Sequence, residues 1–371
     1  MIVVKAVGTV RTMTDEPTLE HVFTRRSEQW SEDQPLASAL ATLAAQTEAI
    51  RAIVAPTEVA QYAKPALLLA AFTHVMRRSA AGHELARYFP TLGGTDAPDE
   101  RFAAVVNDFV DGHRDELTRV CARPGGYRQC SPLTAAILWP AIAWFSAGRR
   151  VHLIELGGTA GVGLAVDEFA YRYAGRLVRE AGGPRLAVES EGELPDEIGA
   201  GIDVAGRYGL ELEPIRSTDA EDIAWLLDCV APDRPEERTL LAAALDAVAT
   251  LTIDWRKGDY CQTLPPVLAE IPDEDLAIVY NAHTLCCNDN RAAVPRALAE
   301  SGKDLVWIAK EHVDVSLGLI TEIDSDVEDA KSVVLSAVEY DGGESVGVWK
   351  LADCDGLSRS LSWAPTRFPV A

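Results

Sequence analysis

The segment from Val151 to Gly163 constrains the fold more than any other part of the sequence. A short apolar run, Val151–Ile154, ends in Glu155 and leads into the glycine-rich stretch Leu-Gly-Gly-Thr-Ala-Gly-Val-Gly. The next residues, 164–180, have an amphipathic helical pattern. A strand, a tight glycine loop and a helix form the opening unit of a nucleotide-binding α/β sheet. We therefore predict a Rossmann-like α/β domain over residues 149–371.

The rest of this region alternates between apolar runs and helical patterns. Runs at 186–188, 210–215, 251–253, 276–280 and 305–309 are separated in several places by amphipathic segments such as 219–229 and 235–249. This alternation predicts a mainly parallel sheet with helices on both faces. Near the C-terminus, two β-rich runs flank Asp341-Gly-Gly-Glu344, which predicts an antiparallel hairpin.

The first 148 residues have helical periodicity instead. Apolar residues recur at helical spacing in 36–53, 65–78 and 102–120, and proline and glycine separate these segments. We predict an all-α N-terminal domain over residues 1–148, which would act as a cap or a substrate domain for the α/β domain.

Charge and composition exclude several classes of protein. The chain has 34 Lys+Arg against 57 Asp+Glu, a formal net charge of -23, so we expect neither nucleic acid nor an anionic membrane as a partner. The most apolar stretch, 132–145, is too short to span a membrane. Seven scattered cysteines, and an N-terminus without an apolar secretory region, favour a reducing cytoplasmic location.

The glycine loop suggests a particular type of ligand. Gly157, Gly158 and Gly161, with Thr159 among them, would allow the backbone to approach a ligand closely. A carboxylate at Glu155 would repel a pyrophosphate but attract an ammonium or a sulfonium. The chain also lacks the G-x-x-x-x-G-K-[S/T] phosphate loop. These features favour S-adenosyl-L-methionine as cofactor, with a tight turn that binds no ligand as the alternative.

At residues 155–161 the sequence resembles class I S-adenosylmethionine-dependent methyltransferases, whose first motif is an acidic residue, any residue, and then G-x-G-x-G. The segment 256–260 looks like the motif that ends the third strand of that fold. The resemblance implies that Asp259 contacts the adenine amino group and that Tyr260 stacks on the ring. The segment 276–283 looks like the fourth strand, whose carboxyl end faces the methyl group and the substrate.

Over nearly its whole length the chain resembles a bacterial family called domain of unknown function 2332. Segments 65–74 and 207–214 carry this likeness, together with the Glu155 loop, Asp167, Tyr171, Trp225 and Arg238. The resemblance implies that Glu211 is the acid that binds the ribose at the end of the second strand. Glu189 is the alternative, because Glu211 lies farther from the glycine loop than is usual and needs an inserted segment.

His283 is the candidate general base. An imidazole accepts a proton near neutral pH, and a hydroxyl or amine acceptor must lose one around methyl transfer. Tyr280 and Asn281 could orient a substrate by hydrogen bonds. A hydrogen-bonded structural role for His283 is the alternative. Cys286 and Cys287 lack a second pair at zinc spacing, so we expect no metal.

We therefore predict an S-adenosylmethionine-dependent methyltransferase that acts on a small molecule, and a homodimer stays open. Two other hypotheses stay open. The same fold could use this cofactor for cyclisation or another alkyl transfer, or the protein could be a non-catalytic ligand-binding protein.

Overall fold

The computed structural model describes residues 17–288, 290–321 and 333–369, which divide into two units. Of the described residues, 17–130 and 219–242 form a helical unit, and 131–218 and those from 243 onward form a sheet unit. This division by contacts begins the sheet unit at Ser131, whereas the predicted boundary follows residue 148. Helix α6 (Leu133–Ser146) belongs to the sheet unit, because it is apolar on all sides and packs on the sheet. Residues 219–242 return to the helical unit.

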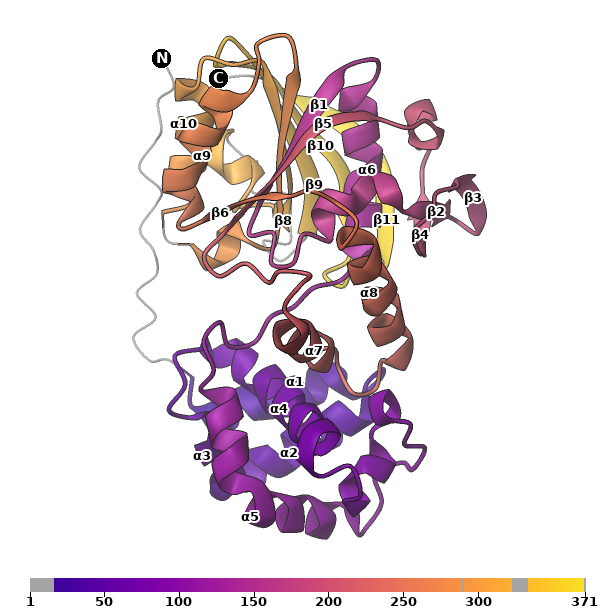
Figure 1. Ribbon diagram of the computed structural model, residues 1–371, viewed down its shortest axis with the longest axis vertical. Coiled ribbons are helices and arrows are strands. Elements are labelled where there is room, and N and C mark those ends of the chain that lie inside the picture. The colour runs from indigo at the N-terminus through magenta and orange to yellow at the C-terminus, as the bar shows by residue number, and fades with distance from the viewer. Residues whose placement is uncertain (1–16, 289, 322–332, 370–371) are drawn as a thin grey trace. The chain divides into compact units, whose positions relative to one another are not determined.

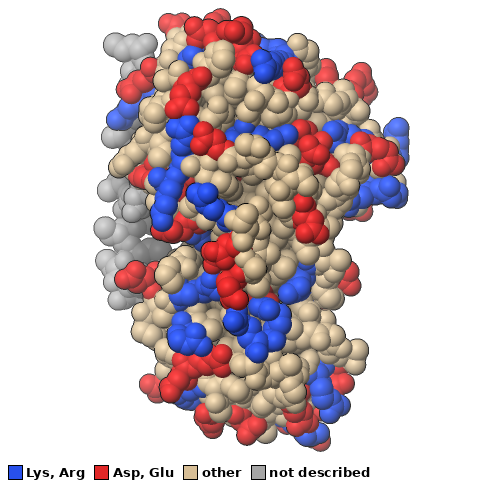
Figure 2. All heavy atoms as spheres, viewed as in Figure 1, with Lys and Arg blue, Asp and Glu red and all other residues tan. Residues whose placement is uncertain are grey.

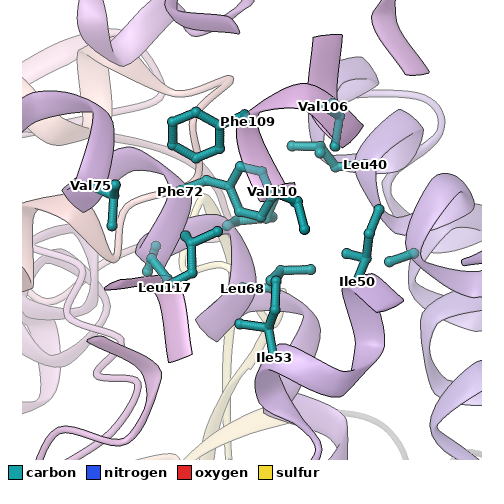
Figure 3. Close-up of a cluster of buried hydrophobic side chains, with 14 of the residues drawn as sticks. Leu40, Ile50, Ile53, Leu68, Phe72, Val75, Val106, Phe109, Val110 and Leu117 are labelled. Atoms are coloured by element: carbon teal, nitrogen blue, oxygen red, sulfur yellow. The ribbon is translucent and has the colours of Figure 1, made fainter. Parts of the chain in front are cut away.

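The helical unit confirms the helical periodicity of the N-terminal region. Its helices are α1 (Leu19–Trp30), α2 (Pro35–Gln46), α3 (Glu48–Val54), α4 (Lys64–Ser79), α5 (Phe102–Cys121), α7 (Ala220–Asp228) and the beginning of α8 (Pro235–Val248). Figure 3 shows the core that these helices share, in which Leu68 and Phe72 of α4 lie among side chains of α3 and α5. Burial of these apolar side chains stabilises the unit.

A buried carboxylate ties the returning segment to this core. Asp228, at the end of α7, is fully buried, and its Oδ2 lies 2.8 Å from His74 Nδ1 and 2.7 Å from Arg77 Nη2. Burial raises the pKa of Asp228, but hydrogen bonds from His74 and Arg77 outweigh this effect and lower the pKa overall. The side chain of Trp225 also donates to the carbonyl oxygen of Gly126, at 2.9 Å.

The sheet unit contains one sheet of eleven strands. They are β1 (Arg150–Leu156), β2 (Ala170–Tyr173), β3 (Arg176–Arg179), β4 (Arg185–Glu191), β5 (Asp203–Glu211), β6 (Asp254–Lys257), β7 (Leu276–Ala282), β8 (Leu305–His312), β9 (Val333–Asp341), β10 (Glu344–Cys354) and β11 (Ser360–Phe368). Their order is β3-β2-β4-β11-β10-β9-β8-β7-β1-β5-β6. Helices α9 (Tyr260–Glu270) and α10 (Ala293–Glu300) pack on one face and α6 on the other (Figure 1).

The parallel half of the sheet has the predicted Rossmann-like arrangement. Strands β6, β5, β1, β7 and β8 are neighbours and all run parallel. In chain order this is the 3-2-1-4-5 pattern, whose direction of winding reverses between β1 and β7. The predicted C-terminal hairpin is present as β9 and β10, and β11 adds a further antiparallel strand. A ligand is therefore expected beyond the carboxyl ends of β1 and β7.

The helix predicted over 164–180 is corrected by the structure. These residues form a short 3-10 turn, η4 (Gly163–Glu168), and the hairpin of β2 and β3. The hairpin turns at Ala174 and Gly175, whose φ values of 46° and 76° are typical of a type I′ turn. No helix therefore follows the glycine loop, and an anion site at a helix N-terminus is not formed there.

Two surface features bear on the expected partners. Among the described residues, no helix combines the length and apolar composition that crossing a membrane requires. Figure 2 shows acidic and basic side chains mixed over the visible face. Some of the acidic side chains are paired with basic ones, such as Asp254 and Glu270 with Arg256 at 2.7 and 2.6 Å.

Candidate functional site

The glycine loop joins the end of β1 to the turn η4 at the point where the sheet reverses its winding. Gly157, Thr159 and Gly161 have φ values of 73°, 44° and 78°, in the left-handed region. The loop is tied to β5 because Gly157 N donates to the carbonyl oxygen of Leu210 at 2.8 Å. A Cβ at Gly157 would come within 2.6 Å of the Thr284 methyl group. Packing within the protein thus already requires glycine there, whether or not a ligand binds.

Glu155 lies beneath this loop. Its carboxylate fills the space beside Gly158 and Gly163, where a Cβ at Gly158 would lie 3.0 Å from Oε2. Within the described part of the chain, this buried Oε2 has no hydrogen-bond partner. Burial, together with the charge of Glu211, raises the pKa of Glu155 to about 8, although a backbone bond from Leu164 lowers it. A buried carboxyl group with an unused oxygen is suited to a cationic ligand.

Glu211 stands at the carboxyl end of β5, next to the loop. It is buried, and its Oε2 accepts a hydrogen bond from the backbone N–H of Thr159 at 3.1 Å. Glu189 lies in β4, which five other strands separate from β1, and its side chain is exposed. Of the two candidates for the ribose acid, only Glu211 lies beside the glycine loop.

Asp259 and Tyr260 follow β6, the neighbour of β5. The N–H of Gly258 donates to the carbonyl oxygen of Glu211 at 3.0 Å, which places the ends of these strands together. Asp259 caps helix α9, because its Oδ1 accepts from Cys261 N at 2.9 Å. Tyr260 is only 8% exposed and packs in the core beneath the sheet. Asp259 thus lies where the resemblance implies, whereas the ring of Tyr260 is turned inward.

Tyr280 and Asn281 are both buried and already bonded within the protein. Tyr280 donates from its hydroxyl to the carbonyl oxygen of Gly163 at 3.1 Å and so supports the glycine loop. The side-chain amide of Asn281 donates to Glu311 at 2.8 Å and accepts from Trp307 Nε1 at 2.8 Å. Consecutive residues of a strand face opposite sides of the sheet. The two side chains therefore do not converge on one substrate.

His283 follows β7 with a positive φ of 52°. Its Nε2 lies 2.8 Å from Lys310 Nζ, and its ring also bonds the backbone of Gly356. Burial, with the charges of Lys310 and His312, lowers the pKa of His283 to about 4. The general-base role of His283 stays a prediction, and it requires one of these bonds to be exchanged for a bond to the acceptor.

Glu311 orders the turn after β7, although the sequence did not single it out. It is buried, and its Oε1 accepts from the backbone N–H groups of Thr284 and Leu285 at 2.6 and 2.9 Å. The hydroxyl of Thr284 donates to the carbonyl oxygen of Leu156 at 3.1 Å. The sequence does contain an indication of this role, because two charged residues, Lys310 and Glu311, end an otherwise apolar strand.

An ion pair between Arg207 and Asp167 supports the turn η4, which follows the glycine loop. Arg207 of β5 binds both oxygens of Asp167 at 2.7 Å and also donates to the carbonyl oxygen of Leu164. Two residues that carry the family likeness, Asp167 and Arg207, thus support η4.

Potential metal ligands near this site were predicted not to form a metal centre. Among the described residues, no group of three or more His, Cys, Asp or Glu side chains could hold a metal ion. Cys286 is exposed, and its Sγ lies 3.4 Å from the carbonyl oxygen of His283.

The fold and this site define a class: Rossmann-like α/β proteins in which a glycine loop and two acids lie where the sheet reverses its winding. The sequence matches a family model described as "Uncharacterized protein conserved in bacteria (DUF2332)" over residues 20–363, and the chain belongs to this family. The predicted family resemblance is thus confirmed.

No curated protein matches the sequence. A solved structure titled "Crystal Structure of MtNAS in complex with MTA and tNA" is 9% identical and covers 79% of this chain and 81% of its own, with a TM-score of 0.25. A likeness at this TM-score carries no argument about function.

Proposed function

We propose that the sheet unit binds S-adenosyl-L-methionine at the glycine loop and transfers its methyl group to a small-molecule acceptor. The observation that carries this proposal is the buried Glu155 carboxyl group, whose Oε2 has no hydrogen-bond partner among the described residues. It lies at the reversal point of the sheet, where ligands of this fold class bind. Its raised pKa means that ionisation is costly unless a positive charge comes near.

Three acids would hold the cofactor from three neighbouring strands. Glu155, at the end of β1, would face its cationic groups. Glu211, at the end of β5, would accept hydrogen bonds from the ribose hydroxyls, and Asp259, after β6, would accept one from the adenine amine. Gly157, Gly158, Thr159 and Gly161 would form the backbone that faces it.

The cofactor supplies a methyl group that is already activated by the sulfonium. The protein then needs mainly to align a nucleophile with this methyl group and to exclude water. Thr284 and His283, directly after β7, lie beside the loop and would face the acceptor.

Isothermal titration with S-adenosylmethionine tests the first part of the proposal. We expect saturable binding by the wild type and at least tenfold weaker binding by Glu155→Ala. Glu193→Ala, in an exposed acidic turn, is the matched control and should bind as the wild type does. No binding by the wild type would refute the proposal.

Product analysis tests the second part. Incubation with candidate acceptors and labelled cofactor should yield S-adenosylhomocysteine and a methylated product. Methylthioadenosine with an alkylated product would favour another alkyl transfer instead. Binding without turnover of any acceptor would favour a ligand-binding protein.

A further inference from the structure

Lys310 is a buried cation next to the candidate acceptor site. It lies near the end of β8, on the strand that pairs with β7, and it is fully buried. Among the described residues, no carboxylate forms a salt bridge with it, and its Nζ lies within hydrogen-bond distance of His283 Nε2. Buried charges are normally paired, so an ammonium in this position needs an explanation.

The contact between Lys310 and His283 is fixed by the backbone as well as by the side chains. Nζ and Nε2 are 2.8 Å apart, and the backbone N–H of His283 donates to the carbonyl oxygen of Lys310 at 3.0 Å. The bond between the ring and the backbone of Gly356 raises the pKa of the ring, as a ring N–H donor would. These bonds place the proton of a neutral ring on Nδ1 and leave Nε2 as an acceptor.

Charges of both signs surround the pair. From β8 come Glu311, on the opposite face of the strand, and His312, whose ring centre lies 6.3 Å from that of His283. From the end of β10 come Cys354 and, just after it, Asp355. Burial lowers the pKa of Lys310, whereas these acidic neighbours raise it. Burial and the charge of Lys310 both lower the pKa of His283. The imidazole is therefore a weaker base than the Lys310 amine.

We propose that Lys310 is a positioning residue of the candidate active site: it holds the proton shared with His283 and thereby keeps the imidazole neutral, with Nε2 as an acceptor. The role of Lys310 in an active site rests on the proposed function, whereas the protonation of Lys310 and His283 is independent of it. A single positive charge then lies buried near the end of β8, and β7 separates this strand from β1, which carries Glu155.

Histidine and lysine NMR titrations of the cofactor-free protein test the proposal. In the wild type, the ring of His283, assigned by its loss in His283→Asn, should be the Nδ1–H tautomer and should not titrate between pH 5.5 and 8.5. Lys310→Met is expected to raise the pKa of His283 from about 4 toward its ordinary value, because it removes the neighbouring charge while burial of the ring remains. Lys310→Arg keeps the charge and should leave His283 neutral over the same range. His152, whose Nε2 lies 2.9 Å from Asp275 Oδ2 on a different part of the sheet, is the internal control.

Two results would overturn the proposal. One is a wild-type His283 that titrates near pH 6.5, or whose titration is unchanged in Lys310→Met. The other needs no variant and serves if Lys310→Met does not fold: a Lys310 Nζ nitrogen shift of a neutral amine in the wild type at pH 7. Because these measurements contain no cofactor, a failure of the proposed cofactor binding would leave them interpretable.

Discussion

Cofactor binding should release the proton of Glu155, and this linkage follows from the burial of that carboxyl group. Its pKa of about 8 leaves it mostly protonated in the free protein at pH 7. A cationic ligand stabilises the ionised form, so binding should expel the proton. Affinity should therefore rise with pH up to the pKa of Glu155 in the free protein and be constant above it.

The size of the effect follows from that pKa. With a value of about 8, the ionised fraction is about 1% at pH 6, about 10% at pH 7 and about 90% at pH 9. The dissociation constant should thus fall by about tenfold for each pH unit between pH 6 and 7.5, and by roughly 100-fold between pH 6 and 9. At pH 7 the ionisation costs about 1.4 kcal/mol of binding free energy.

Calorimetry measures both the affinity and the proton. Titrations at pH 7 in phosphate and in Tris, which differ in ionisation enthalpy, should show that Glu155 releases about 0.9 proton on binding. Glu155→Gln cannot ionise, so its titrations report any proton that the ligand itself loses. The difference between wild type and variant isolates Glu155. Glu213→Gln, which changes an exposed carboxylate two residues after the end of β5, should behave as the wild type. Equal pH dependence in the wild type and Glu155→Gln would refute the reasoning.

Three further predictions concern stability and the adenine site. Gly157→Ala should lower the free energy of unfolding, measured by urea denaturation, by roughly 1–3 kcal/mol more than Gly148→Ala does. Both glycines have positive φ, but only at Gly157 would a Cβ collide with a neighbouring side chain. Equal losses in the two variants would contradict the packing argument. Asp259→Ser should preserve the cap of α9 and its stability but weaken cofactor binding in calorimetry by roughly 1.5–3 kcal/mol; unchanged affinity would assign Asp259 to the cap alone. Asp228→Ala should destabilise the helical unit by about 1–3 kcal/mol, because it leaves the buried ring of His74 and the half-buried guanidinium of Arg77 without their hydrogen-bond acceptor; a loss below about 0.5 kcal/mol, measured by urea unfolding, would show that this network is not structurally important.

The central strands could be predicted from the sequence because their residues are buried on both faces. Strands β1, β7 and β8 are nearly continuous apolar runs, and such runs between helical patterns are typical of a parallel sheet. The order of the acidic motifs along the chain also placed Glu155, Glu211 and Asp259 at neighbouring strand ends.

The segment 164–180 was predicted incorrectly because its local pattern was ambiguous. Its apolar residues fit a helical period, yet Tyr171 and Tyr173 also alternate with arginine around an Ala-Gly turn, which is a hairpin pattern. The boundary between the two units differs from the predicted one for another reason. The Asp228 network joins residues more than 150 positions apart, and no local pattern reports such a contact.

The contacts of individual side chains were the least predictable part of the site. Tyr280 and Asn281 were assigned to one substrate, although adjacent residues of a strand point to opposite faces. His283 was selected for its chemistry, but its partner Lys310 comes from another strand. The identity of a base at a strand end therefore depends on which neighbouring strand supplies its hydrogen-bond partner.

The charges at the carboxyl edge of the sheet are arranged in order across the strands. Glu155 and Glu211 end β1 and β5, whereas His283 and Lys310 lie at the ends of β7 and β8. Once a cationic ligand ionises Glu155, the two carboxylates and the ammonium produce a field along the edge, which Glu311 beside Lys310 partly offsets. A cofactor with a positive sulfonium would be drawn toward the carboxyl groups, and an acceptor with an anionic reacting group would be drawn toward the buried ammonium. The sheet order that brings β1 beside β7 would then set the two reactants next to each other in the orientation that methyl transfer requires.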